Sequence, residues 1–102
     1  MDNMLEKDFC LGFTKINIVH LAAKKPVFGA LIAREFAKHG HIISPGTLYP
    51  ILHRLERDGY LESQLKTVHG KVHKYYQTTT KGKTALGQAK RHIENMVNEI
   101  IQ

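Results

Sequence analysis

The stretch SPGTLYPILHRLERDGYL, residues 44 to 61, decides the fold of this chain of 102 residues. Leu48, Leu52 and Leu55 recur at spacings of four and three residues, which predicts an amphipathic helix with one apolar face. Ser44 stands where that helix would begin and belongs to the residue types that cap helix N-termini. The stretch therefore predicts a helix that begins after Ser44 and ends at the glycine of the DGYL segment.

The unusual feature of this helix is its beginning, which contains two prolines and a glycine. Pro45 fits the first helical position, because the N–H that it lacks has no partner there in any helix. Gly46 has no side chain, so the helix start can closely approach another backbone or a phosphate. Pro50 removes one backbone hydrogen bond and is expected to loosen the first turns. Such a start favours a helix that enters a groove, although the same prolines could also begin and bend a helix of the core.

Charge is unevenly distributed along the chain. Fifteen Lys and Arg residues stand against nine Asp and Glu residues, which gives a formal net charge of +6. Between residues 63 and 93 there are seven basic residues and no acidic one. Such clustering is typical of a surface that binds phosphates, with a solvated basic face as the alternative.

The single cysteine, Cys10, cannot form an intrachain disulfide, and no apolar run approaches the roughly 20 residues of a membrane span, so we expect a cytoplasmic protein.

The rest of the chain predicts two helices before the quoted stretch, and a hairpin and a helix after it. Residues 4 to 24 and 27 to 40 carry apolar side chains at helical spacing. The strand-like runs YLESQLK and VHKYYQTTT are joined by TVHG, with Gly70 at the turn. Thr80 is placed to cap the final helix. This order predicts a mainly α protein with a small β-hairpin, a winged helix-turn-helix with a C-terminal dimerisation helix.

Two domains follow from this order of elements. We expect residues 1–80 to form a winged helix-turn-helix that binds DNA, and residues 81–102 to form a dimerisation helix that packs with helix 5–24. Catalysis is not indicated, because the chain has no HExxH motif, no nucleophile elbow and no glycine-rich phosphate loop. The close histidine pairs lack a further cysteine or carboxylate at ligand spacing. We therefore expect no enzyme, no metal and no cofactor.

Much of the chain resembles the PadR family of transcriptional regulators. The resemblance rests on the segment from GFTKIN to GYLES, on KYYQTTTKGKTAL, and most specifically on the motif SPGTLYPxLxRLExDGYL. It implies an N-terminal winged helix-turn-helix, a dimer formed by the C-terminal helix and the first helix, and repression of genes at palindromic operators. Ala30 departs from the pattern, because the family often has an aromatic residue after the first-turn glycine. The C-terminal part is a single helix, as in the short-chain branch of the family.

The candidate DNA-binding residues lie in the expected recognition helix and wing, which the resemblance places at the helix start and at residues 66–74. Arg54 and Arg57 are candidates to read bases, since arginine to guanine is the commonest specific contact, with a phosphate contact as the alternative. Tyr49 could bind a phosphate or bury its ring against the neighbouring helix. The lysines and histidines of the wing are expected to touch the DNA backbone or minor groove. The full set is Ser44, Gly46, Thr47, Tyr49, Pro50, His53, Arg54, Arg57, Lys66, His69, Lys71, His73 and Lys74.

The final helix carries an apolar seam that needs a partner. Its apolar residues are spaced by three, four, three and four positions, and so small a domain offers no obvious surface to bury them. Phe9, Phe13 and Met96 are candidates to line a pocket for a small planar or aromatic effector at the dimer centre, although they could also simply fill the interface. The expected interface residues are Leu5, Phe9, Phe13, Ile16, Leu86, Ala89, Ile93, Met96, Val97 and Ile100.

Two function classes follow from these patterns and from the family resemblance. The first is a dimeric, sequence-specific DNA-binding repressor whose partners are double-stranded operator DNA, a second copy of the chain and a small aromatic effector, with no membrane. The second is a winged-helix protein–protein interaction module without specific DNA binding. Salt dependence separates the two, because phosphate contacts make DNA affinity fall steeply as salt rises.

Overall fold

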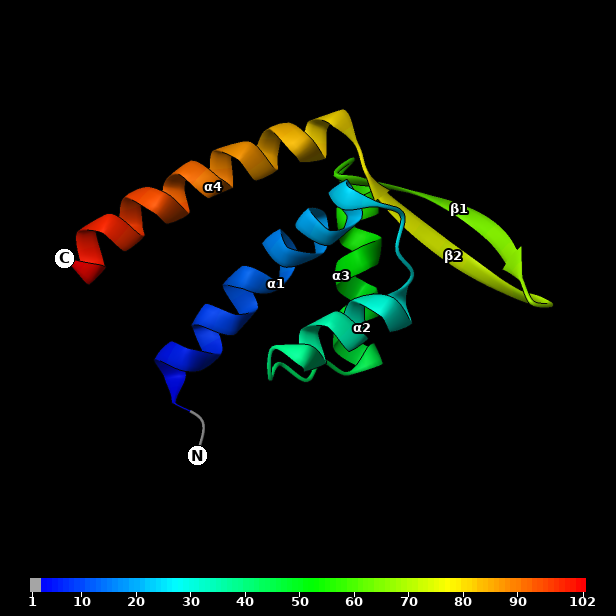
Figure 1. Cartoon of the computed structure of the whole chain (residues 1–102), viewed down its shortest axis with the longest axis horizontal. Coiled ribbons are helices and arrows are strands. Elements are labelled where there is room, and N and C mark those ends of the chain that lie inside the picture. The colour runs from blue at the N-terminus through cyan, green and yellow to red at the C-terminus, as the bar shows by residue number, and fades with distance from the viewer. Residues whose placement is uncertain (1–2) are drawn as a thin grey trace.

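The computed structural model describes residues 3–102 and contains four helices and one hairpin in that part of the chain (Figure 1). This confirms the predicted fold class, a mainly helical winged helix-turn-helix. Residues 1 and 2, which the expected DNA-binding domain includes, lie outside the described residues. In chain order the elements are α1 (Met4–Lys24), α2 (Gly29–Lys38), α3 (Pro45–Arg57), β1 (Leu61–Val68), β2 (Lys71–Thr78) and α4 (Thr80–Ile101).

The quoted stretch folds as one helix, α3. It begins with Pro45 after Ser44, but the Ser44 hydroxyl does not cap the helix and instead donates a hydrogen bond to Thr47 Oγ1 at 3.2 Å. The helix runs through Pro50 without a break in its assignment. Its three leucines are buried, and the chain leaves the helix through Gly59, whose φ of +86° lies in the left-handed region that favours glycine.

The core lies where the first three helices meet the base of the hairpin. Ile18, Ile32 and Leu52 come from three different helices and are completely buried. Tyr76 of β2 is almost as fully enclosed. The buried Thr78 hydroxyl donates a hydrogen bond to the Val19 carbonyl oxygen at 2.7 Å, which joins the end of the hairpin to α1. These contacts hold the hairpin against the helices. The hairpin needs this packing because an isolated two-stranded ribbon has marginal stability in water.

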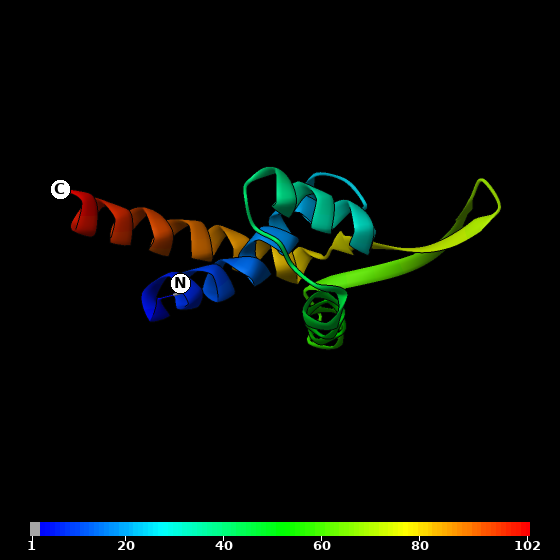
Figure 2. The ribbon, with the colours of Figure 1, turned by 90° about the horizontal axis from the view of Figure 1, so that it is seen from below.

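The hairpin projects away from the helices as a wing (Figures 1 and 2). Its turn consists of His69 and Gly70 alone, with φ angles of +51° and +78°. A two-residue turn needs positive φ at both residues if its twist is to match that of the strands. The turn is shorter than the predicted TVHG, because Thr67 and Val68 pair with β2. At its base, Val27 exchanges backbone hydrogen bonds of 2.9 and 2.7 Å with Tyr76 and so widens the sheet.

The N-cap of α4 is Thr79 and not the predicted Thr80, so that prediction was wrong by one residue. The Thr79 hydroxyl accepts a hydrogen bond from the Gly82 N–H at 3.1 Å. Strand pairing ends at Thr78, and therefore Thr79 is the first residue free to turn into the helix. Gly82 follows in a tight place: a Cβ there would lie 2.3 Å from the Tyr60 carbonyl oxygen.

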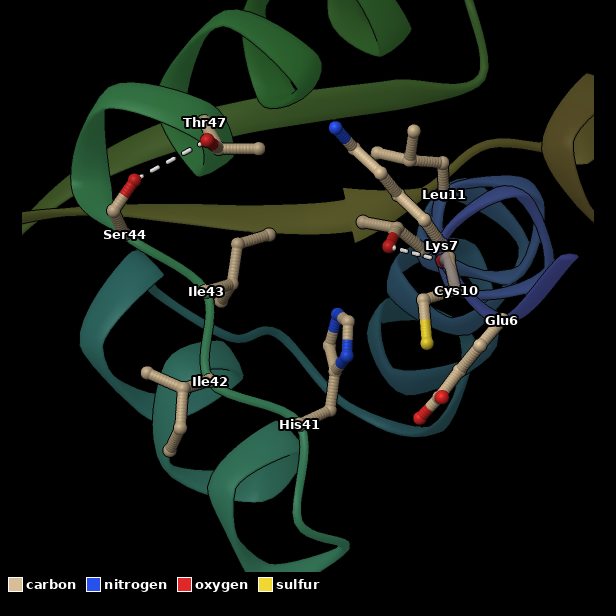
Figure 3. Close-up of a pocket in the computed structure, with 10 residues that line it drawn as sticks. Glu6, Lys7, Cys10, Leu11, His41, Ile42, Ile43, Ser44 and Thr47 are labelled. Carbon is tan, nitrogen blue, oxygen red and sulfur yellow. Dashed lines mark hydrogen bonds between the residues drawn. The ribbon is translucent and has the colours of Figure 1, made fainter. Parts of the chain in front are cut away.

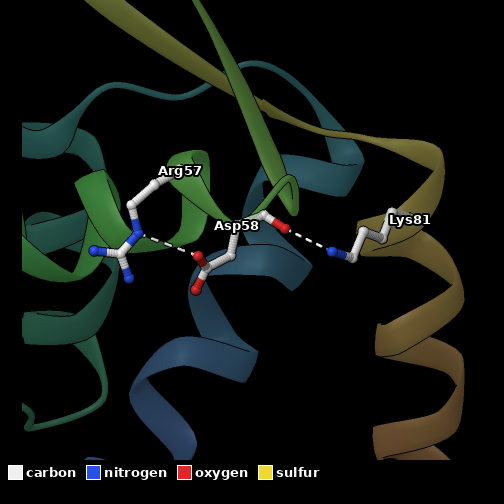
Figure 4. A network of polar contacts seen from close by, with 3 residues as sticks. All are labelled: Arg57, Asp58 and Lys81. Atoms are coloured by element: carbon white, nitrogen blue, oxygen red, sulfur yellow. Dashed lines mark hydrogen bonds and ion pairs between the residues drawn. The ribbon is translucent and has the colours of Figure 1, made fainter.

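The end of α3 is fastened to the beginning of α4 (Figure 4). The Lys81 ammonium group donates a hydrogen bond to the Asp58 carbonyl oxygen at 2.7 Å, and it lies 4.7 Å from the centroid of the Tyr60 ring. The Thr79 hydroxyl donates to the Gly59 carbonyl oxygen at 2.6 Å. A cation beside the last carbonyl groups of a helix stabilises that end. We call these contacts the α3–α4 junction.

The first half of α4 packs against α1 of the same chain, where Leu86 is buried and Ile16 lies against the core. Farther on, both helices extend beyond the core (Figures 1 and 2). Their apolar side chains remain open there: Leu5 and Phe9 are 79% and 61% exposed, and Met96 and Ile100 are 58% and 72% exposed. In the described part of the chain, no helix is both long and apolar enough to cross a membrane.

Candidate nucleic-acid interface

The polar face of α3 is open along its whole length, opposite the three buried leucines. Arg54 forms no ion pair within residues 3–102, whereas the Arg57 guanidinium lies 3.2 Å from the Asp58 carboxylate. The first turn contains no acidic side chain. The structure therefore places every predicted recognition-helix residue on one accessible face: Ser44, Gly46, Thr47, Tyr49, Pro50, His53, Arg54 and Arg57 are all exposed.

Tyr49 also packs against the beginning of α2. A Cβ added to Gly29 would lie 2.7 Å from the Tyr49 hydroxyl oxygen, so the ring covers the backbone of that glycine. The side chain is nevertheless 43% exposed. The two interpretations of Tyr49, ring packing and phosphate contact, are thus compatible in one geometry.

The outer wing presents its basic residues to solvent. Lys66, His69 and Lys71 are exposed, and neither lysine forms an ion pair within residues 3–102. The Lys66 ammonium group lies 5.3 Å from the centroid of the Tyr75 ring. These side chains are free to approach a phosphate backbone.

His73 and Lys74, nearer the base of the wing, have partners within the chain. The His73 ring is half-buried and stacks on Phe28 with centroids 4.5 Å apart. The Lys74 Nζ lies 3.1 Å from Glu56 Oε1 of α3, and the Ser63 hydroxyl donates a hydrogen bond to the other carboxylate oxygen. Sequence reasoning missed Phe28 and Glu56. The available signal was Glu56 itself, the only acidic residue of α3.

Glu56 and Lys74 each stabilise the charged form of the other. The Ser63 hydrogen bond, with the Lys74 ammonium group as a further cause, holds the pKa of Glu56 below its ordinary value, although partial burial opposes the shift. The same carboxylate raises the pKa of Lys74. Both groups therefore stay charged over the whole physiological pH range.

A cleft of about 410 Å³ lies between the beginning of α2, α3 and the wing. It brings together four of the predicted DNA-binding side chains, those of Tyr49, His53, His73 and Lys74. Ala30 stands at its edge, where the methyl group of alanine fills less space than an aromatic ring. The cleft thus joins α3 to the base of the wing, whereas Lys66, His69 and Lys71 lie outside it.

The structure does not bring the candidate effector residues together within one chain. The rings of Phe9 and Phe13 are tilted by 32° to each other with centroids 4.5 Å apart, and they line a cavity of about 200 Å³ against the end of α2. Met96 is not part of this cavity. An effector pocket that uses all three residues would need a second chain.

A larger cavity, of about 480 Å³, separates α1 from the loop before α3 (Figure 3). Cys10 and His41 point toward each other across it, and Ser44 and Thr47 of the recognition-helix start lie at its far side. Within residues 3–102, no group of three or more His, Cys, Asp or Glu side chains is arranged to hold a metal ion.

Fold and surface together define a winged helix-turn-helix transcriptional regulator. The chain belongs to the PadR-like family of transcriptional regulators, whose sequence model matches residues 18–88. The transcriptional regulator Rv3488 of Mycobacterium tuberculosis is 39% identical over 95 residues, which cover 93% of this chain and 89% of that protein.

Solved structures of the family have the same fold. A PadR family regulator from Eggerthella lenta matches with a TM-score of 0.85 and 26% identity, over 94% of this chain and 85% of that chain. A PadR-like regulator from Bacillus cereus matches with a TM-score of 0.80 and 28% identity, over 93% of this chain and 97% of that chain.

Proposed function

We propose that this chain is a dimeric repressor that binds a palindromic operator. In this proposal α3 enters the major groove, while the wing contacts the adjacent phosphate backbone. The observation that carries the proposal is the pairing of an open polar face on α3 with free basic side chains on the outer wing. Membership of a family of transcriptional regulators supports it.

The exposed apolar residues at the ends of α1 and α4 support the dimer. We propose residues 1–80 as the DNA-binding domain and residues 81–102 as the dimerisation helix, which completes its packing on helix 5–24 of the partner. Two copies are needed because a palindrome presents its half-sites about 34 Å apart in successive major grooves. The proposed interface is the set predicted from the sequence, of which Leu86 is already buried against α1 of its own chain. The set is Leu5, Phe9, Phe13, Ile16, Leu86, Ala89, Ile93, Met96, Val97 and Ile100.

We also propose that a small planar or aromatic molecule releases the protein from its operator. The neighbouring rings of Phe9 and Phe13, with Met96 from the partner, would line the site at the dimer centre. Titration of planar aromatic compounds into the protein–operator complex tests this proposal. Release by one of them supports the site, and no release by any of a broad set contradicts it.

The deciding experiment measures DNA affinity against salt, with an operator selected from a random DNA pool. If the dimer neutralises on the order of 6 to 10 phosphates, the log–log slope is expected to be roughly −5 to −9. Lys71→Ala should flatten the slope by about one for each phosphate that is no longer neutralised, and it should weaken binding to all sequences equally. A wild-type slope near zero would contradict DNA binding and favour the protein-interaction module.

A further inference from the structure

We propose that Glu56 is a positioning residue for DNA recognition, which holds the wing at a defined angle to the recognition helix through Ser63 and Lys74. The inference rests on the proposed DNA-binding function and deepens it. It also assigns a different role to Lys74, which then supports the wing in place of binding a phosphate.

The two oxygens of the Glu56 carboxylate reach one strand each. One accepts the hydrogen bond from the Ser63 hydroxyl on β1, and the other lies 3.1 Å from the Lys74 Nζ on β2. In the hairpin register Ser63 stands opposite Tyr76, and Lys74 stands opposite Leu65, so the two contacts fall close together along the ladder. One side chain of α3 therefore holds both strands near the point where the wing leaves the core.

These are also the polar contacts by which α3 itself holds the wing. Among the described residues, every hydrogen bond or ion pair between side chains of 45–57 and those of 61–78 involves Glu56. The remaining anchors of the hairpin lead elsewhere: Tyr76 pairs with Val27, and Thr78 binds the carbonyl oxygen of Val19 in α1. Without Glu56 the hairpin would keep its base but lose its polar link to the helix that reads DNA.

The charge of Glu56 makes a purely electrostatic role unfavourable. A carboxylate between Arg54 and Arg57 repels DNA phosphates and lowers affinity for every sequence. It also neutralises Lys74, whose ammonium group would otherwise attract a phosphate. Electrostatics alone therefore predicts that removal of the Glu56 charge strengthens DNA binding. A positioning role predicts the opposite sign for the operator, and this difference makes the inference testable.

The experiment compares Glu56→Gln with wild type in the full-length dimer. Glutamine keeps the shape and can still accept the Ser63 hydrogen bond, but it cannot form the ion pair with Lys74. We expect affinity for the operator to fall at least about threefold, as for directly coupled residues, while affinity for random duplex of equal length is unchanged or slightly higher. The control is Glu62→Gln, which removes the same charge from an exposed strand position that forms no ion pair within residues 3–102. It should not weaken operator binding.

A double variant separates the support role of Lys74 from a phosphate contact. If Lys74 acts through Glu56, Lys74→Met should weaken operator binding without flattening the salt slope, and adding it to Glu56→Gln should cause no further loss of operator affinity. A direct phosphate contact predicts instead that Lys74→Met weakens operator and random DNA alike and flattens the slope by about one. That result, or operator binding by Glu56→Gln as tight as wild type, would overturn the inference.

Hydrogen exchange in the free protein gives a readout that does not depend on DNA. Glu56→Gln should accelerate amide exchange in residues 61–68 and 71–78 relative to Glu62→Gln, with the helices unchanged. Equal exchange in the two variants would contradict the positioning role even if the DNA results agreed with it. If wild type and Glu62→Gln bind the operator with steep salt dependence while Glu56→Gln behaves like them, the proposed function stands and the positioning role alone fails.

Discussion

Arg54 and Arg57 differ in how free their guanidinium groups are to read DNA. Arg57 donates one N–H to the neighbouring Asp58 at 3.2 Å, with both side chains in solvent. Arg54 forms no ion pair within the described residues. A planar guanidinium without an internal partner can donate both hydrogen bonds of a bidentate guanine contact. We therefore expect Arg54, rather than Arg57, to be the residue that selects a base.

Arg54→Ala is expected to relax sequence preference at one or two operator positions. The loss should be about 1–3 kcal/mol per half-site if the contact is bidentate to guanine. Binding to a set of operators, each with a single base pair changed, measures the effect. An equal loss on operator and random DNA would make Arg54 a phosphate contact instead.

The Glu56 cluster predicts a pH dependence of stability with a definite sign. The Ser63 hydrogen bond, followed by Lys74, lowers the pKa of Glu56 from its ordinary value of 4.5. The charged form is therefore favoured by folding, so its contribution is present above that ordinary value and is lost as the pH falls through the lowered pKa. Wild type should unfold at a higher temperature than Glu56→Gln at neutral pH, and the gap should close in acid. A gap that is independent of pH would contradict this assignment.

At the scale of elements, the α3–α4 junction makes the recognition helix and the proposed dimerisation helix neighbours in space. Lys81 binds the carbonyl oxygen of Asp58, the C-cap of α3, and Thr79 binds that of Gly59 in the turn that follows. Gly82 lets the first turn of α4 lie directly on the Tyr60 backbone. A shift of α4 would therefore act on the end of α3 through short, direct contacts.

Gly82→Ala is expected to destabilise the protein, although alanine is the better helix former. The new Cβ would lie 2.3 Å from the Tyr60 carbonyl oxygen, so backbone must move, at a cost of about 1–3 kcal/mol. Gly87→Ala is the matched control in the same helix, because its nearest atom, Arg91 Nη1, lies 3.9 Å away. It should stabilise by up to about 1 kcal/mol. Denaturant unfolding of both variants measures the contrast, which equal effects would refute.

The sequence predicts those features that depend on the spacing of neighbouring residues. The apolar period gives α1 from Met4 to Lys24, and the glycine at the hairpin turn locates the wing. The interactions that were missed are tertiary. Phe28 meets His73, far along the chain, and the partners of Glu56 lie on two strands whose register no local pattern specifies. The N-cap of α4 was displaced by one residue because three consecutive threonines are locally equivalent and strand pairing decides among them.

At the scale of the whole molecule, the chain is incompletely buried where α1 and α4 extend beyond the core. Helices of this length are marginal in isolation and draw their stability from packing of an apolar face. The inner half of α4 has that packing on α1, whereas the outer half leaves Met96, Val97 and Ile100 open. Dimerisation would therefore bury the outer half of α4 and, in the same step, bring two recognition helices together.

Ile93→Asp is expected to yield a monomer or a partly unfolded chain. The residue is half-buried in the middle of the seam, and a carboxylate there would be desolvated without a partner. Operator affinity should fall to near non-specific levels although no DNA-facing residue has changed. Asn95→Asp places the same charge on an exposed neighbouring position and should remain dimeric. Sedimentation of both variants beside wild type decides the question. A wild-type monomer at micromolar concentration, or a dimeric Ile93→Asp variant that still binds operator, would contradict the proposed interface.

The two-residue turn of the wing sets how its reach could change during evolution or redesign. Because the turn is closed by His69 and Gly70 alone, a residue inserted into one strand only would shift the pairing and reverse the faces of its side chains. Length must therefore be added in pairs, one residue to each strand. One pair inserted between the base of the wing and the lysines would place Lys66 and Lys71 on the opposite face of the hairpin. Two inserted pairs would return both lysines to their present face. Variants that keep both lysines on their present face of the hairpin are thus spaced in steps of about 7 Å.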